Sequence, residues 1–542
     1  MTFLSPCSDA EESAGSNVYS INNADSWDSS TNLTNQQTPD SKPRRRTLRN
    51  AVFSLLGKAQ AAVFSYIIIK LLLDVLSVEQ YGLYSLLFIG VMVNFSMVFQ
   101  LGTPSLLTRF VPERFTASDW RGVHEIFGRI FRLQFLVGLA IALLVFFLAP
   151  QLSEWINFPG ESNIIRVFSL AAILYLLSEV HHLTFSAIFR QQTVFGVTIA
   201  FNTLRLLFLG AVYLYYRDFM AVVVAEGVAL GFCLLFYAVA YRRIVRPSLP
   251  KQPVAKPEES GADWPRMKKF AGLSYINEIG VAILSVATDF FLVSGILGGI
   301  ATGFYGLANR INDLAQKVLP MKMLGPVIQP LFFSEYGANK EKAEFGFRML
   351  VKATLFPTVA VAVWMTVMSK EVIVYVFDPR YADAWMLVAV MALFLPSASM
   401  RMPLGLMMQN HERVDILIFA KISGVLKIIA GIILLPKYGY NAMPWITGFA
   451  VLAQNNIVYY FVKKIAKARM DILGNIRIWL NAVAAGIVIY FLKPYLDSLI
   501  GVIASVFIFT VLFLIFSMIN RGFSKAERDF INSKLPKPYW KF

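Results

Sequence analysis

The chain is poor in cysteine, histidine and charged residues. Its 542 residues include 2 cysteines and 4 histidines, and charged residues make up 15% of it. The two cysteines, Cys7 and Cys233, are too few and too far apart for a disulfide framework or a cysteine metal cluster. No nucleophile elbow, phosphate-binding glycine loop or metal-ligand cluster occurs, and no loop is long enough for a soluble catalytic domain. The sequence therefore predicts no catalytic residues, no metal and no cofactor.

Apolar side chains dominate instead. They make up 56% of the chain, and the mean hydropathy is +0.57, more than a soluble protein of this length carries. A bilayer core of ~30 Å needs ~20 helical residues to cross it. The sequence therefore predicts an all-α integral membrane protein with about 14 transmembrane helices. The predicted spans are residues 51–73, 84–107, 127–149, 164–189, 194–216, 219–241, 270–297, 303–330, 349–368, 384–408, 414–435, 442–462, 476–493 and 498–519.

Positive charge gathers in alternate loops between these spans. The formal net charge is +16, and the predicted boundaries place roughly 32 Lys and Arg on the side of both termini against about 5 on the other side. Both termini are therefore expected in the cytoplasm. No nucleic-acid partner is expected, because cations spread over many short loops do not form one basic face.

Polar segments divide the chain into predicted domains. Residues 1–43 are acidic and rich in Ser, Asn and Thr, which predicts a disordered cytoplasmic tail. Several prolines among charged residues predict a cytoplasmic linker at residues 242–269. The other predicted segments are an N-terminal lobe at 44–241, a C-terminal lobe at 270–462, two further helices at 463–520 and an interfacial cytoplasmic tail at 521–542.

The two predicted lobes share a short sequence motif. Matching residues follow the first and the seventh spans at a constant offset of 221 positions: Leu76, Gly82, Tyr84 and Leu86, then Leu297, Gly303, Tyr305 and Leu307. Because each copy holds an even number of spans, the copies should be parallel and related by an axis along the membrane normal. Chance similarity in a biased composition is the alternative.

The segment from Asn50 to Pro112 contains LSVEQYGLYSL at the first turn and QLGTP near the end of the second span. This segment, like the seventh and eighth spans, resembles the polysaccharide-biosynthesis branch of the multidrug, oligosaccharidyl-lipid and polysaccharide exporter superfamily, over residues 48–520. The resemblance implies two parallel six-helix lobes around a central cavity, two extra C-terminal helices, and flipping of polyprenyl-pyrophosphate-linked oligosaccharides in a bacterial cytoplasmic membrane. The implied partners are the lipid-linked oligosaccharide, membrane lipids and other polysaccharide-assembly proteins.

Charged side chains at membrane depth cost ~2.5–3.5 kcal/mol each on insertion, so those present should face a wet cavity or a partner. In the eighth span Arg310 and Lys317 flank Asp313 at helical spacings, which leaves one cation free for a pyrophosphate. Amides there can bind sugar hydroxyls, although the same stripe could instead join helices by hydrogen bonds. Arg401, Lys421 and Lys427 are further candidates. The predicted substrate-binding cavity comprises Lys58, Arg205, Asn309, Arg310, Asn312, Asp313, Gln316 and Lys317.

Two carboxylates of the seventh span, Glu278 and Asp289, could bind a coupling ion or form ion pairs, with Lys58 a possible partner of Glu278. Two rival functions stay open. A multidrug or organic-ion antiporter of the same superfamily would favour acidic residues within the lobes, and a membrane-embedded polysaccharide polymerase or ligase would be expected to present a large external loop. Cations at depth and short external loops favour a lipid-linked oligosaccharide flippase that works by alternating access.

Overall fold

The computed structural model describes residues 60, 62–248, 264–319, 340–411, 413–534 and 540–542. These residues form helices and their connections, with no strand among them. Within the described part, ten helices are long and apolar enough to cross a membrane. The number of spans rises to eleven if one bent pair of helices is counted as a single span. The predicted class, an all-α membrane protein, is confirmed.

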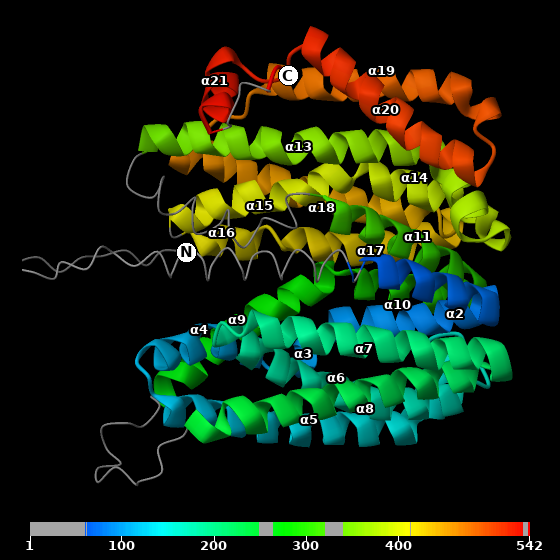
Figure 1. Cartoon of the computed structure of the whole chain (residues 1–542), viewed down its shortest axis with the longest axis vertical. Coiled ribbons are helices and arrows are strands. Elements are labelled where there is room, and N and C mark those ends of the chain that lie inside the picture. The colour runs from blue at the N-terminus through cyan, green and yellow to red at the C-terminus, as the bar shows by residue number, and fades with distance from the viewer. Residues whose placement is uncertain (1–59, 61, 249–263, 320–339, 412, 535–539) are drawn as a thin grey trace, which may run out of the picture. The chain divides into compact units, whose positions relative to one another are not determined.

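The first half of the chain runs through helices that pack mostly on one another (Figure 1). Its first described helix covers residues 62–75. One continuous span, Val78–Phe99, follows, in which a π-helical segment, Ser85–Phe95, lies between two short α-helices. The helices are α2 (Val78–Tyr84), α3 (Ser96–Phe99), α4 (Thr103–Thr116), α5 (Trp120–Trp155), α6 (Ser162–Ala187), α7 (Gln191–Ala211) and α8 (Phe219–Ile244).

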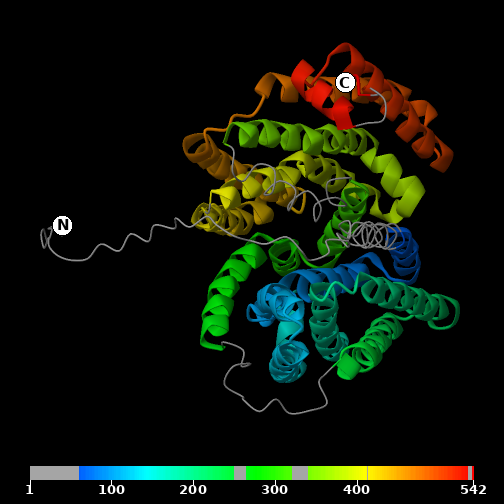
Figure 2. The ribbon, with the colours of Figure 1, turned by 60° about the vertical axis from the view of Figure 1, so that its left-hand side comes forward.

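The second half begins with two helices, α9 and α10, that are bent by 47° at Ser285. Figure 2 shows the C-terminal helices, in orange and red, beside α13, which they contact. The helices are α9 (Trp264–Leu284), α10 (Val286–Leu297), α11 (Gly299–Val318), α13 (Lys340–Glu371), α14 (Trp385–Leu393), α15 (Leu395–Asn410), α16 (Val414–Phe419), α17 (Ile422–Tyr438), α18 (Ala442–Phe461), α19 (Ile472–Leu492), α20 (Leu499–Ile519) and α21 (Lys525–Lys534).

Polar caps fix where several of these helices start. Asp119, Asp218, Asp471 and Ser498 each accept a hydrogen bond from the backbone N–H three residues later, at the starts of α5, α8, α19 and α20. Such a bond satisfies one of the N–H groups that a helix start leaves unpaired. The short polar breaks in the sequence thus set the turns between spans.

The predicted count of 14 spans is not confirmed. The first predicted span begins outside the described residues. Helices α11 and α18 are formed but are not among those apolar enough to count as spans. Charged residues interrupt α11, and the run Gln454, Asn455 and Asn456 interrupts α18. The predicted tail at 1–43 and most of the linker at 242–269 also lie outside the described residues.

The two copies of the repeat motif meet where α2 packs against α11. A Cβ atom on Gly82 would overlap the backbone of Gly299 and Gly303, and one on Gly303 would overlap the Val78 carbonyl oxygen. Gly82 and Gly303 are equivalent positions of the repeat. Because only a hydrogen side chain fits there, the two backbones approach in direct contact. We call this contact the glycine seam.

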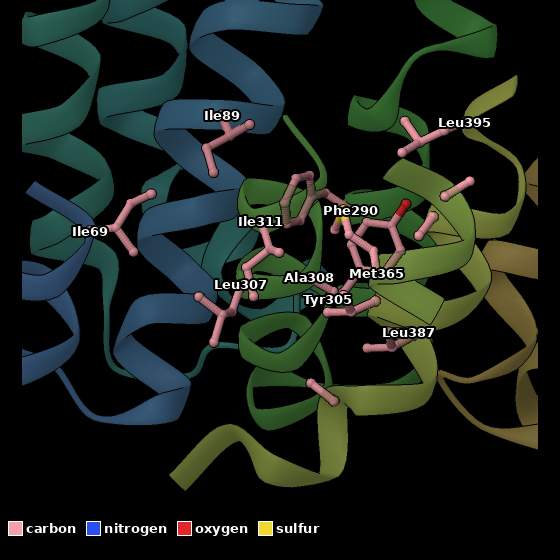
Figure 3. Packing of buried hydrophobic residues seen from close by; sticks show 14 of the residues in the cluster. Ile69, Ile89, Phe290, Tyr305, Leu307, Ala308, Ile311, Met365, Leu387 and Leu395 are labelled. Atoms are coloured by element: carbon pink, nitrogen blue, oxygen red, sulfur yellow. The ribbon is translucent and has the colours of Figure 1, made fainter. Parts of the chain in front are cut away.

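Apolar packing continues across the glycine seam. Leu307, Ala308 and Ile311 of α11 belong to one buried cluster with Ile69 of the first helix and Leu387 of α14. Figure 3 shows the α11 side chains between the blue helices of the first half and the olive helices of the second. The seam and this cluster hold the two groups of helices together in the conformation observed.

Candidate functional site

A cavity of about 550 Å³ lies among α9, α10, α11, α15, α18 and the start of α17, and Asn94 of the second span also lines it. Its wall mixes amides, hydroxyls, one carboxylate and two cations, an unusual set for the middle of a membrane protein. The polar residues of the wall are Asn94, Ser285, Asp289, Tyr305, Asn309, Asn312, Gln316, Arg401, Lys421, Thr447 and Gln454.

Helix α11 contributes three of the predicted site residues. Asn309, Asn312 and Gln316 follow one another at spacings of three and four, so they lie on one helical face, and that face lines the cavity. Their amides can donate to and accept from hydroxyl groups. Whether they bind a substrate stays a prediction.

The charged residues of α11 lie outside the cavity wall. Lys317 pairs with Asp313 at 3.0 Å, and both side chains are about one third exposed. Arg310 lies close enough to Tyr81 and Tyr84 for its charge to act on both phenols. Arg310, Asp313 and Lys317 each follow a cavity-lining amide by one position, which turns them about 100° around the helix. On this helix the amides therefore lie on the cavity wall and the charged residues beside it, and the substrate-binding role of both sets stays a prediction.

Arg205, also predicted for the cavity, forms a polar cluster in the first half of the chain. Its guanidinium donates to Glu226 Oε2 at 2.7 Å and Oε1 at 2.6 Å, and to the Tyr84 hydroxyl at 2.8 Å. Tyr84 in turn donates to Glu226 at 2.7 Å. Side-chain exposures of 18% for Arg205 and 3% for Glu226 make this a largely desolvated pair. Arg205 does not line the cavity, and sequence reasoning missed its partner Glu226.

A second cluster of buried polar side chains lies in the second half. Asp289 accepts from Lys427 Nζ at 2.6 Å, from the Tyr305 hydroxyl at 2.7 Å and from Thr447 at 3.0 Å. The Lys427 and Asp289 side chains are both 0% exposed in the structure. Asp289 therefore forms an ion pair, one of the two roles predicted for it.

The two clusters are related by the repeat offset of 221 residues. Tyr84 corresponds to Tyr305, and Glu226 corresponds to Thr447. Arg205 corresponds to a position one residue before Lys427. In both halves a tyrosine on the helix at the glycine seam bonds to a buried carboxylate that is neutralised by a cation from the fifth predicted span of that lobe.

The cavity keeps a surplus of positive charge, because Lys427 already neutralises its carboxylate. Lys421 Nζ donates to the Asn277 carbonyl oxygen at 2.9 Å and to Asn277 Oδ1 at 2.5 Å, neither of which carries a charge. Arg401 is exposed to the cavity, and no ion pair with a described residue is found for it. Among the described residues of the cavity wall, Arg401 and Lys421 are therefore the cations available to an anionic ligand.

Glu278 lies on α9, against α4. Ser105 Oγ donates to its Oε1 at 3.0 Å, while its buried Oε2 has no hydrogen-bond partner among the described residues. Lys58, predicted both for the cavity and as a partner of Glu278, lies outside the described residues. In the described part of the chain, no group of three or more metal-ligand side chains comes together.

Residues 71–386 match the family model described as polysaccharide biosynthesis protein. The chain belongs to this family. No curated protein matches it in sequence. The family resemblance seen in the sequence is thereby confirmed.

Several solved structures share the fold of this chain. The lipid II flippase MurJ in its inward closed conformation matches with a TM-score of 0.63 and 16% identity, over 90% of this chain and 99% of MurJ. An inward-facing MATE-family multidrug resistance transporter of the MOP superfamily matches with a TM-score of 0.60 and 13% identity, over 77% of this chain and 98% of the transporter. A MOP superfamily transporter from Pyrococcus furiosus, reported to have a binding pocket of reversed polarity, matches at 0.57 and 14%, over 78% and 96%.

Proposed function

We propose that this protein is an alternating-access flippase that translocates polyprenyl-pyrophosphate-linked oligosaccharides for cell-surface polysaccharide export. The observation that carries the proposal is the cavity in which Arg401 and Lys421 are free of carboxylate partners among the described residues. A pyrophosphate head group is negatively charged, and a cation that has no carboxylate partner can form an ion pair with it. The family match supports a cargo of polysaccharide assembly.

The cavity offers complementary chemistry for both parts of the head group. Arginine binds phosphate oxygens through a planar pair of N–H donors, and lysine acts as a compact point charge. Asn309, Asn312 and Gln316 on the facing helix offer amides to sugar hydroxyls. Together these groups replace the water that a charged sugar phosphate loses on entering a membrane, which is the main barrier to its crossing.

The glycine seam supplies the gate in this proposal. The predicted topology puts both termini in the cytoplasm, and the seam then closes the external end of the cavity. Opening the seam while the opposite end closes would expose the cavity to the other side of a bacterial cytoplasmic membrane. The proposed moving units are the predicted lobes at residues 44–241 and 270–462.

A multidrug or organic-ion antiporter is the second candidate. The likeness to a MATE-family transporter and the half-satisfied carboxylate of Glu278 favour it. A cationic drug would, however, meet the positive charges of Arg401 and Lys421 in the cavity. A membrane-embedded polymerase or ligase draws no such support, because the similar structures are transporters and flippases.

The test is flipping of a polyprenyl-pyrophosphate-linked oligosaccharide with a fluorescent sugar in proteoliposomes, scored by protection from a membrane-impermeant quencher. We expect Arg401→Gln and Lys421→Gln each to slow flipping at least tenfold. The matched control is Arg413→Gln, which removes the same charge from an exposed pair with Asp415 outside the cavity wall. Wild-type flipping rates in both cavity variants would contradict the proposal. Export of a cationic dye by an otherwise inactive wild type would support the antiporter.

A further inference from the structure

A second hollow, with a volume of about 800 Å³, lies between α17 and α18. Its walls are almost entirely apolar. Leu426 of α17 and Phe449 of α18 line it and are 60% and 59% exposed. Exposed apolar side chains on the packed helices of a membrane protein contact lipid rather than water. The hollow, called here the α17–α18 groove, is therefore open to hydrocarbon.

The groove and the polar cavity share α18 as a wall. Thr447 and Gly448 face the cavity, whereas Trp445 and Phe449 face the groove. A Cβ on Gly448 would overlap the ring of Phe394, which also lines the cavity. The Phe394 ring lies 5.8 Å from that of Trp445 and 5.5 Å from that of Phe449, centroid to centroid. The Phe394 ring thus packs on α18 residues that line the cavity and on α18 residues that line the groove.

Helix α17 links the cavity cation to the groove. Lys421 lines the cavity. The residues of α17 that line the groove form a stripe that starts two residues later, at Ser423, and ends at Tyr438. At 1.5 Å per residue this stripe is about 22 Å long, most of the ~30 Å bilayer core. Lys427 also lines the groove, but its side chain is 0% exposed and its ammonium group donates to Asp289. A molecule with an anionic head and a long hydrocarbon chain would fit both spaces at once.

We propose that the α17–α18 groove binds the head-proximal isoprene units of the cargo's polyprenyl chain while the pyrophosphate stays with Arg401 and Lys421. The inference rests on the proposed function and adds a tail site to it. The chain passes from cavity to groove beside Gly448 when the Phe394 ring turns aside. The protein therefore carries the tail along its own surface instead of leaving it wholly in the lipid.

The test measures the thermal unfolding midpoint of the purified protein with two probes, undecaprenyl phosphate and inorganic pyrophosphate, since a ligand of the native state raises that midpoint. Ala453→Trp fills the groove from an exposed position on α18. Leu426→Ala is the second variant and removes part of the groove wall. The matched control is Ile433→Trp, which is 52% exposed on α17 but does not line the groove.

We expect both groove variants to bind undecaprenyl phosphate at least tenfold more weakly than wild type, with pyrophosphate binding unchanged. The Ile433→Trp control should bind both probes normally. Wild-type affinity for undecaprenyl phosphate in Ala453→Trp and Leu426→Ala would overturn the inference. Equal protection by dipalmitoyl phosphatidic acid would also overturn it, because the groove would then hold ordinary lipid. If pyrophosphate does not raise the unfolding midpoint of the wild type, the proposed cavity is contradicted. In that case, weaker binding of undecaprenyl phosphate by the two groove variants than by the wild type would still support the groove.

Discussion

Removing the Lys427 ammonium should destabilise the fold through the charge that it leaves behind. Lys427 and Asp289 are 2.6 Å apart with both side chains 0% exposed. Breaking such a pair by removing one partner costs about 3–5 kcal/mol, because the remaining charge is buried and uncompensated. Asp289 would still accept hydrogen bonds from Tyr305 and Thr447. We therefore expect Lys427→Met to lose about 3 kcal/mol, the lower end of that range.

The double variant Lys427→Met/Asp289→Asn isolates the charge effect. It keeps a polar group for Tyr305 and Thr447 and leaves no buried charge, so most of the lost stability should return. The cluster of Arg205, Glu226 and Tyr84 provides the matched comparison. Arg205→Met should be destabilising by a similar amount, and Arg205→Met/Glu226→Gln should recover it. The measurement is the free energy of unfolding by sodium dodecyl sulfate in mixed micelles.

Two results would refute this reasoning. A loss below about 1 kcal/mol in Lys427→Met would mean that the pair is solvated, as for an exposed ion pair. A double variant as unstable as Lys427→Met would mean that the lost packing of the lysine stem, rather than the stranded carboxylate, sets the cost.

Three further predictions concern other parts of the molecule. Gly303→Ala places a Cβ on the Val78 carbonyl oxygen, so pairs of spin labels across the glycine seam should shift to longer distances, while Gly210→Ala, with nothing within 4 Å, should leave them unchanged. Lys352→Met leaves Asp471 and Glu527, its partners at 2.5 and 2.6 Å, without their shared cation, so α21 should become cleavable by limited proteolysis, whereas Arg413→Gln should not expose it. Arg310→Ala should retain flipping in the proteoliposome assay, because Arg310 lies outside the cavity wall, and a loss equal to that of Arg401→Gln would contradict the cavity assignment.

The sequence predicted the parts of this fold that local patterns determine. The lengths of the apolar stretches predicted most of the helices. The repeat inferred from the matching spacing of Gly82 and Tyr84 with Gly303 and Tyr305 stays a prediction. The sequence also pointed to α11 as a helix with a polar face. It could not choose between Asn309 and Arg310, because adjacent residues on a helix point about 100° apart and only the packing partner decides which one meets the cavity.

Contacts between helices were beyond the reach of sequence patterns. Glu226 follows Arg205 by 21 residues, on the next helix of a hairpin, and no local spacing indicates that they meet. The repeat offered one signal, since Glu226 falls 221 residues before Thr447, but it is indirect because the carboxylates of the two clusters come from different helices. The sequence offers Arg401 and Lys421 as candidates, yet nothing in it places them in one cavity.

The paired clusters bear on how the glycine seam could open. Tyr84 on α2 bonds to Glu226 of α8 and receives a bond from Arg205 of α7, while Tyr305 on α11 bonds to Asp289 of α10. If α2 moved away from α7 and α8, a buried carboxylate would lose a donor, at a cost of about 1–3 kcal/mol. Separation at the glycines breaks mainly close backbone packing. The weaker boundary is therefore the seam, and its opening should move α2 with α7 and α8, and α11 with α10 and α17, as two units.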